Sequence, residues 1–321
     1  MDKDREKGKH TLHPRNKHKE LYDFNALILA VPELEPFVRT NAYKNKSLDF
    51  FDPVAVRLLN KALLKHVYGI TYWDIPADYL CPPVPGRADY LHHIADLLAE
   101  SYSGSGELKI PVGNQTKCLD IGVGANCIYP IIGVQEYGWH FIGSDTDPVA
   151  IQSASRIVQA NPSLNGKVDL RWQPNPKEIF NTVLKKEEQI DVCICNPPFH
   201  VSAEEAMEGS IRKLKKLTKG KIKEPLLNFG GKNNELWCDG GEERFIRNMI
   251  FQSKEVASNC LWFTSLVAKQ AHLKRIYNAL EKVAAVKVKT IIMGQGNKTS
   301  RIIAWTFKHE NENKRKNEKN K

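Results

Sequence analysis

The sequence predicts an α/β fold in which a doubly wound, mostly parallel sheet of about seven strands follows a mainly helical N-terminal segment. Two observations support this prediction. From residue 117 onward, short apolar runs alternate with segments whose apolar residues recur at helical spacing. Before residue 111, prolines alternate with helical patterns instead. Strands that alternate with helices are typical of parallel sheets, because each strand needs a crossover before the next can run beside it.

Residues 1–20 are expected to be disordered, whereas residues 21–110 are expected to be folded. The first twenty residues lack apolar periodicity, so we expect a disordered basic arm in which the histidines are solvated (His10, His13 and His18). Residues 21–110 are expected to form an N-terminal extension. Its first clear helix is predicted at Pro53–Tyr68, since Asp52 is a typical N-cap and proline is favoured at the first helical position. A second helix is predicted over residues 88–100.

Residues 111–308 alternate strands with helices and are expected to form the main domain, with an insert at 201–240. The strands are predicted at Lys117–Ile121, 139–145, 167–172, Ile190–Cys195, 260–264, 286–293 and 301–307. The helices between them are predicted to begin near Asn126, after Asp147, near Gly241 and at Lys269. The last two strands are expected to form a hairpin across residues 294–297.

Positive charge is concentrated in three segments. Residues 1–20 and 308–321 each carry a net +3, and residues 209–223 (GSIRKLKKLTKGKIK) carry seven basic residues and no acidic one. The whole chain is +10, so the remainder comes to about −3. A segment of concentrated basic charge usually binds a polyanion, and nucleic acid is the first candidate. We expect RNA contacts from the lysines of the insert (Lys213, Lys215, Lys216 and Lys219) and a disordered basic tail at 309–321.

The composition indicates a globular protein rather than a disordered one, with 41% hydrophobic and 26% charged residues. No run approaches the roughly 18 apolar residues of a membrane helix, and the first residues lack the apolar core of a signal peptide. The seven cysteines are odd in number and include no C-x-x-C pair, which argues against disulfides and zinc. We therefore expect a cytoplasmic protein without membrane association or bound metal.

Residues 120–126 (DIGVGAN) predict a ligand-binding loop at the end of a strand. Gly122 and Gly124 allow a sharp turn and a close approach of the backbone to a ligand. Asp145 ends the next strand about twenty residues further on, where a carboxylate can accept hydrogen bonds from both hydroxyls of a ribose. These features fit NAD and S-adenosylmethionine equally.

The motif Asn196-Pro197-Pro198-Phe199 directly follows the fourth predicted strand and indicates methylation of an amine on a planar base. The lone pair of such an amine is delocalised into the ring, so the amine attacks poorly. Two acceptors that bind its N–H groups draw the nitrogen toward tetrahedral geometry. The Asn196 side-chain oxygen can be one of these acceptors and the Pro197 carbonyl the other. Two prolines keep the loop extended, and Phe199 can stack on the base.

These motifs together resemble the bacterial large-subunit rRNA adenine-N6-methyltransferase family and are similar to the eukaryotic U6 small nuclear RNA adenine methyltransferases. The resemblance spans about residues 21–307 and is carried by DIGVGANCIYP, CICNPPF, the triplet GGE at 240–242 and GQGNKTSRIIAWTF. It implies a class I, Rossmann-like methyltransferase fold and S-adenosylmethionine as the methyl donor. It further implies an adenine in 23S rRNA, or in a large-subunit precursor, as acceptor, with no obligate protein partner.

The same resemblance implies where the cofactor binds. The stretch VPGRADY matches a family segment whose arginine reaches the cofactor, which assigns Arg87, and the extension is expected to bind RNA and to cover the cofactor. Around the third strand the match is loose, so either Gln173 or Asn175 could face the cofactor adenine; Gln173 is our choice. The remaining expected contacts are Asp120, Gly122, Gly124, Asn126, Asp145 and Asn196. Many relatives have Glu where this chain has Asp145.

Three other functions are considered. The first is an rRNA guanine-N2-methyltransferase, whose target amine is delocalised into its ring in the same way. Some of these enzymes carry Asn-Pro-Pro-Phe-His, and His200 completes that pattern here. A glutamine-N5-methyltransferase acting on release factors usually has Tyr where Phe199 stands and needs no basic insert. A non-catalytic RNA-binding protein with a relic pocket is disfavoured, because Asp120, Gly122, Asp145 and Asn196 are intact.

Overall fold

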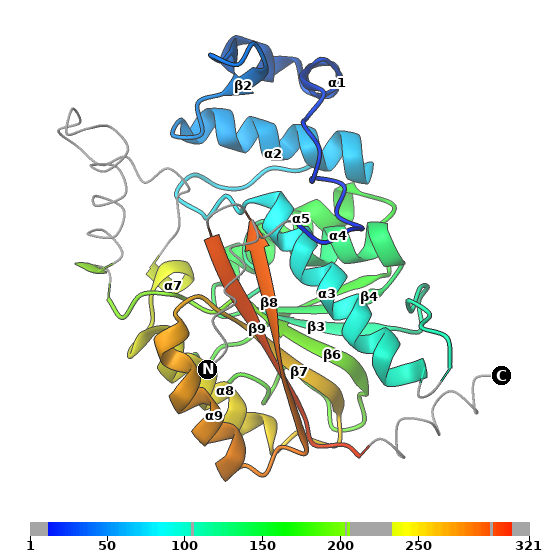
Figure 1. The fold of residues 1–321 in the computed structure, drawn as a ribbon, viewed down its shortest axis with the longest axis vertical. Coiled ribbons are helices and arrows are strands. Elements are labelled where there is room, and N and C mark those ends of the chain that lie inside the picture. The colour runs from blue at the N-terminus through cyan, green and yellow to red at the C-terminus, as the bar shows by residue number, and fades with distance from the viewer. Residues whose placement is uncertain (1–11, 104–105, 203, 206–232, 296–297, 310–321) are drawn as a thin grey trace, which may run out of the picture.

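A sheet of seven strands in the order β5-β4-β3-β6-β7-β9-β8 lies at the centre of the protein (Figure 1). The computed structural model describes residues 12–103, 106–202, 204–205, 233–295 and 298–309. Neighbours among the first five strands run parallel, whereas β9 is antiparallel to both β7 and β8. The strands are β3 (Lys117–Ile121), β4 (His140–Asp145), β5 (Val168–Trp172), β6 (Ile190–Cys195), β7 (Cys260–Val267), β8 (Lys287–Gln295) and β9 (Lys298–Thr306).

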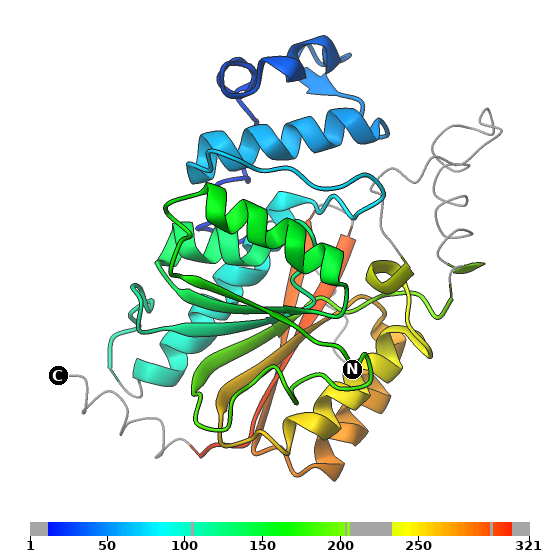
Figure 2. The same cartoon turned by 180° about the vertical axis from the view of Figure 1, so that it is seen from behind.

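Helices cover both faces of the sheet, as Figures 1 and 2 show from opposite sides. One face carries α3 (Val84–Ser103), α4 (Ile128–Tyr137) and α5 (Pro148–Ala160), and the other carries α8 (Gly241–Ser253) and α9 (Leu273–Lys282). Successive residues of β3 alternate between two cores: Cys118 packs with the first helix layer and Leu119 with the second. This three-layer arrangement confirms the predicted doubly wound fold.

The local signals in the sequence explain where the helices begin and end. The Asp52 carboxylate accepts from the backbone N–H of Val54 at 2.9 Å, and α2 occupies Pro53–Tyr68 as predicted. The Asp147 carboxylate likewise accepts from Val149 at 2.8 Å and starts α5. β7 extends three residues beyond its predicted end, to Val267, because it continues to pair with β9 as far as Arg301.

The extension contains elements that the sequence pattern did not predict. Before α2 lie α1 (Phe24–Ala30), a 3-10 helix at Pro32–Phe37 and a small hairpin of β1 (Val38–Thr40) and β2 (Lys46–Leu48). They form the upper part of the molecule in Figure 1. Helix α3, by contrast, shares the core of the sheet, so the expected boundary at residue 110 does not separate two cores. No helix in the described residues is long and apolar enough to cross a membrane.

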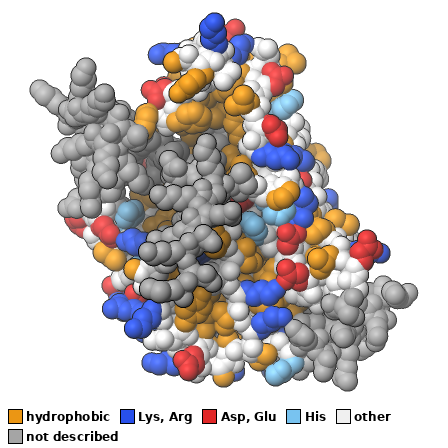
Figure 3. Space-filling view, in the orientation of Figure 1, with side chains coloured by type: hydrophobic (Ala, Val, Ile, Leu, Met, Phe, Trp, Pro, Cys, Tyr) orange, Lys and Arg blue, Asp and Glu red, His pale blue; other side chains and the backbone are white. Residues whose placement is uncertain are grey.

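The expectation of a disordered arm over residues 1–20 is wrong for residues 12–20. The backbone N–H of His13 donates to Asp89 at 2.6 Å, and its ring lies 2.9 Å from the Asp96 carboxylate. Arg15 donates to the His92 carbonyl at 2.8 Å, and His18 is buried rather than solvated. Arg15 pairs with Asp96 at 2.7 Å and Lys17 with Glu136 at 2.8 Å. Acidic and basic side chains are interspersed on the right of the face shown in Figure 3. Residues 1–11 and 310–321 lie outside the described residues.

Two buried histidines make stability depend on pH. Burial, followed by the charge of Lys17, lowers the pKa of His18 to about 4, and burial lowers the pKa of His92 to about 3. The unfolded chain therefore binds more protons below pH 6.5, so the stability contributed by neutral histidine is complete above that pH and is lost as the pH falls toward 4. We expect the free energy of unfolding to fall by up to about 1.4 kcal/mol per pH unit for each histidine.

The measurement is urea denaturation between pH 7.5 and pH 4.5. The free energy of unfolding should fall less with decreasing pH in His18→Gln than in the wild type. His66→Gln is the matched control, because His66 is exposed on α2. An equal fall in all three proteins would show that His18 does not contribute.

Candidate active site

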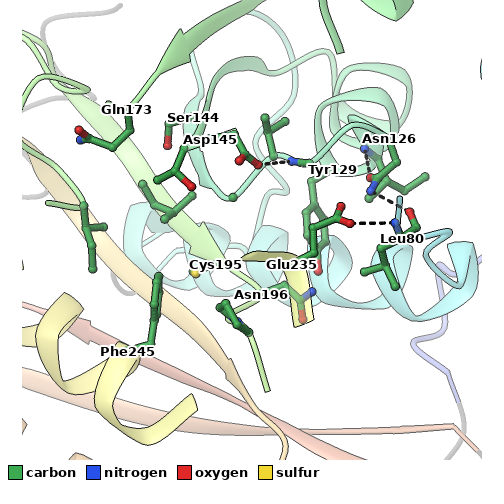
Figure 4. A pocket seen from close by; sticks show the side chains of 18 of the residues that line it. Leu80, Asn126, Tyr129, Ser144, Asp145, Gln173, Cys195, Asn196, Glu235 and Phe245 are labelled. Carbon is green, nitrogen blue, oxygen red and sulfur yellow. Dashed lines mark hydrogen bonds between the residues drawn. The ribbon is translucent and has the colours of Figure 1, made fainter. Parts of the chain in front are cut away.

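A cleft opens at the carboxyl ends of β3, β4 and β6 (Figure 4). Its empty space, including the part open to solvent, is about 910 Å³. Leu80 and Pro82, from the segment between α2 and α3, line the same cleft, so the N-terminal extension forms part of its wall. Seven predicted cofactor residues line it: Arg87, Gly122, Gly124, Asn126, Asp145, Gln173 and Asn196.

The glycine loop is folded back onto the end of β4. Gly122 and Gly124 have φ angles of +78° and +65°, which L side chains rarely adopt. The N–H groups of Gly122 and Val123 both donate to the Ser144 carbonyl at 2.9 Å. A Cβ on Gly124 would also lie 3.0 Å from the side-chain nitrogen of Asn126. Glycine at these two positions lets the loop border the cleft with backbone alone.

Asp145 ends β4 and holds the glycine loop through its carboxylate. One oxygen accepts from the Gly124 N–H at 2.9 Å and the other from the Asp147 N–H at 2.9 Å. Burial raises the pKa of Asp145, and these two backbone donors oppose the rise by favouring the charged form. Each carboxylate oxygen can accept more than one hydrogen bond, so Asp145 can also receive the two hydroxyls of a ribose.

Asp120 does not line the cleft, unlike the other residues expected to touch the cofactor. It is fully buried near the end of β3, and neither carboxylate oxygen has a hydrogen-bond partner among the described residues. Burial, and then the charge of Asp145, raises the pKa of Asp120 well above its usual range, while the Arg87 cation opposes the rise. A buried polar group without a partner is costly, so this carboxyl is suited to a donor arriving with a ligand.

The residues of the Asn-Pro-Pro-Phe motif differ in how they meet the cleft. Asn196 and Pro198 line it, whereas Pro197 is buried and Phe199 is half-buried beside it. The side-chain oxygen of Asn196 is buried and has no hydrogen-bond partner in the described part of the chain. The side chain therefore presents an unused acceptor at the carboxyl end of β6.

Of the two residues considered for the cofactor adenine, Gln173 lines the cleft and Asn175 does not. Gln173 is 3% exposed and lines the cleft, whereas Asn175 is exposed and caps a turn through the Lys177 N–H. The Gln173 amide is bonded to the loop after β5, since it donates to the Asn181 carbonyl at 2.6 Å and accepts from the Asn175 N–H at 3.1 Å. Its side chain thus fixes the wall of the cleft.

Several lining residues were not predicted from the sequence. Glu235 lies on the four-residue helix α7 (Asn233–Leu236), and its carboxylate accepts from the Leu80 N–H at 2.9 Å (Figure 4). Tyr129, Glu178, Ile179 and Phe245 complete much of the wall. No local pattern marks these residues, because they come from four separate segments: α4, the stretch between β5 and β6, α7 and α8.

The predicted RNA contacts of the insert lie outside the described residues (Lys213, Lys215, Lys216 and Lys219). Within the described residues, no three histidine, cysteine, aspartate or glutamate side chains are grouped to hold a metal.

The strand order, the glycine loop, the acid that ends β4 and the motif after β6 define a class I methyltransferase that uses S-adenosylmethionine. The chain belongs to the RNA methyltransferase family, whose sequence model matches residues 6–309. Relatives named ribosomal RNA large subunit methyltransferase F are 56% identical over 299 residues in Cytophaga hutchinsonii and 57% identical over 297 residues in Serratia proteamaculans. The matches cover 93% and 92% of this chain and 92% and 87% of the relatives, respectively.

Two solved structures of human METTL16 share the fold. The catalytic domain in complex with the MAT2A 3′UTR hairpin 6 has a TM-score of 0.75 at 27% identity, covering 93% of this chain and 98% of that one. The N-terminal domain in complex with SAH has a TM-score of 0.72 at 27% identity, covering 93% and 100%. The predicted fold, the methyl donor and the family resemblance are therefore confirmed.

Proposed function

We propose that the protein methylates the N6 amine of an adenine in 23S rRNA, either free or in a large-subunit precursor. The observation that carries this proposal is the unused Asn196 acceptor, which lies in the same cleft as the glycine loop and Asp145. An exocyclic amine is the group that such an acceptor would bind. The names of the bacterial relatives support ribosomal RNA as the substrate. The cytoplasmic location stays a prediction from the sequence.

The residues present fit the cofactor. Asp145 would bind the ribose hydroxyls, and the Arg87 guanidinium would meet a carboxylate. For the fully buried Asp120 to accept from an amino group, the wall of the cleft would have to open toward it. S-adenosylmethionine supplies a methyl group activated by positive charge on sulfur. The Leu80 backbone, held by Glu235, would cover the bound cofactor, which agrees with the expected lid role of the extension.

At the acceptor end, Asn196 and Pro197 would hold the amine through its two N–H bonds. The Asn196 oxygen and the Pro197 carbonyl draw the nitrogen toward tetrahedral geometry, which frees its lone pair for attack on the methyl group. Phe199 would stack on the base and keep the amine aligned, since alignment supplies much of the catalysis in such transfers. Reaching the cleft requires an unstacked base, which costs a few kcal/mol unless the base already lies in a loop or bulge.

Nucleoside analysis of 23S rRNA from cells with and without the gene tests this function. We expect one N6-methyladenosine to disappear with the gene and to return when the purified protein acts on that RNA. Loss of N2-methylguanosine instead would support the guanine alternative, with His200 beside the motif. Methylated glutamine in a release factor, with unchanged rRNA, would support the protein methyltransferase.

The basic insert, which follows the Asn-Pro-Pro-Phe motif in the sequence, is proposed to hold RNA phosphates. Neutralising Lys213, Lys215, Lys216 and Lys219 together should flatten the slope of log affinity against log salt by up to about 3, taking roughly 0.7 for each phosphate contact on single-stranded RNA. Affinity for S-adenosylmethionine should not change. The measurement is RNA binding across a salt series.

The matched control neutralises four exposed lysines at the other end of the strands from the cleft, near the starts of β6 and β7 and the end of α9 (Lys185, Lys186, Lys254 and Lys282). This variant should keep the wild-type slope. If the insert variant also kept that slope, RNA docking would have to lie elsewhere, and the N-terminal extension would be the next candidate.

A further inference from the structure

A buried chain of hydrogen bonds connects helix α3 to the strand that leads into the Asn-Pro-Pro-Phe motif. The Tyr90 hydroxyl lies 2.7 Å from the Thr264 hydroxyl, and the Cys195 N–H lies 3.4 Å from the Tyr90 oxygen. The Thr264 hydroxyl lies 2.9 Å from the Cys193 carbonyl. Tyr90 and Thr264 are both fully buried, so water does not compete for these bonds.

Chemistry settles the direction of each bond. A backbone carbonyl can only accept, so Thr264 donates to Cys193 and its oxygen must accept from Tyr90. A backbone N–H can only donate, so the Tyr90 oxygen accepts from Cys195. The path therefore leaves β6 at Cys195, passes through two hydroxyls and returns to β6 at Cys193. Each hydroxyl donates once and accepts once.

This path lies where the support of β6 by its neighbour β7 ends. The register of β6 with β7 stops at Cys193 opposite Phe263, while its pairing with β3 continues to Cys195. The last two residues of β6 are thus flanked by a strand on one side and by the two hydroxyls on the other. Asn196 follows Cys195 directly, so any movement of this strand end moves its amide.

The same tyrosine is also one helical turn from a predicted cofactor contact. Arg87 precedes Tyr90 by three residues on α3, and residues at this spacing share a helix face. Arg87 and Asn196 both line the cleft, the first on α3 and the second directly after β6. The position of α3 relative to β6 therefore sets the distance between these two residues.

We propose that Tyr90 and Thr264 are positioning residues that hold Asn196 in register with the cofactor through the end of β6. This inference rests on the proposed role of Asn196 in binding the target amine. Tyr90 contacts neither reactant: it is fully buried, does not line the cleft, and its ring packs edge-on against Tyr129. Its action on catalysis goes through the backbone of Cys195.

Tyr90→Phe tests the proposal, because it removes one oxygen and keeps the ring. We expect kcat for methyl transfer to rRNA to fall about 10-fold to 100-fold, in line with the effect of small misplacements of reacting groups. The affinity for S-adenosylmethionine, measured by calorimetry without RNA, should stay within about threefold. Thr264→Val should behave in the same way, whereas Thr264→Ser keeps the hydroxyl and should retain activity.

The decisive comparison repeats Tyr90→Phe in an Asn196→Ala background under single-turnover conditions. If Tyr90 acts through Asn196, its replacement should have little further effect there. An undiminished effect in that background would overturn the proposal, because Tyr90 would then act independently of the amide. Tyr68→Phe is the matched control: it removes a buried hydroxyl bonded to His18 at 2.8 Å, away from the cleft, and should lower stability without lowering kcat.

The outcomes also separate this inference from the proposed function. If Asn196→Ala lowers kcat while Tyr90→Phe and Thr264→Val do not, the positioning role is wrong and the proposed function stands. If Asn196→Ala itself leaves kcat unchanged, the assigned role of Asn196 fails and the inference fails with it. Counting transferred methyl groups by radiolabel makes the result independent of which base is modified.

Discussion

Asn196→Ala is expected to lower kcat by two to three orders of magnitude while the affinity for S-adenosylmethionine changes only a few-fold. The amide oxygen acts on the amine chiefly as the nitrogen becomes tetrahedral, so its contribution is greatest in the transition state. Removing one preorganised polar group aimed at a changing centre typically costs this much. The measurements are kcat on a 23S rRNA fragment and calorimetric titration with the cofactor.

Asn126→Ala is the matched comparison for this prediction. Asn126 also lines the cleft, but its oxygen accepts from the Ile128 N–H at 3.1 Å and its nitrogen donates to the Leu80 carbonyl at 3.4 Å. Its loss should therefore loosen the cofactor loop and act mainly on cofactor binding. An Asn196→Ala protein that turned over at the wild-type rate would refute the role given to the motif.

Asp145→Ala is expected to weaken the binding of S-adenosylmethionine ten-fold or more. The substitution removes the acceptor of two ribose hydroxyls, and losing one hydrogen bond to a charged group costs about 1.5–3 kcal/mol. It also removes the acceptor of the Gly124 and Asp147 N–H groups, so the glycine loop loses its tie to β4. Calorimetric titration measures the affinity, and a thermal melt of each protein separates local loss from unfolding.

Asp169→Ala serves as the control for Asp145→Ala. Asp169 lies on the adjacent strand β5, is exposed and is paired with Arg171 at 2.6 Å, outside the cleft. Its removal should leave cofactor affinity unchanged. Equal affinities for the Asp145 variant and the wild type would place the ribose elsewhere in the cleft.

Most of the fold could be predicted because its signals are local. The strand Ile190–Cys195 is apolar at every position except Asp191. The Asp-Pro pairs at the starts of α2 and α5 mark where these helices begin. The hairpin β1–β2 and the ordered segment 12–20 gave no such signal. In the segment 12–20, polar side chains are held by partners far along the chain, as His13 is by Asp89 and Asp96.

From the sequence we could predict a mostly parallel sheet, the succession of strands and helices along the chain, and three local motifs at the cleft: the glycine loop, Asp145 and Asn196. Local spacing suffices for these, since the carboxyl ends of parallel strands meet at one edge of a sheet. Three features became visible only in the folded chain: Glu235 accepts from the Leu80 N–H at the cleft, Asp120 is fully buried, and Gln173 rather than Asn175 lines the cleft. These depend on which side chains become buried when distant segments pack, and burial of that kind leaves no period or spacing in the chain.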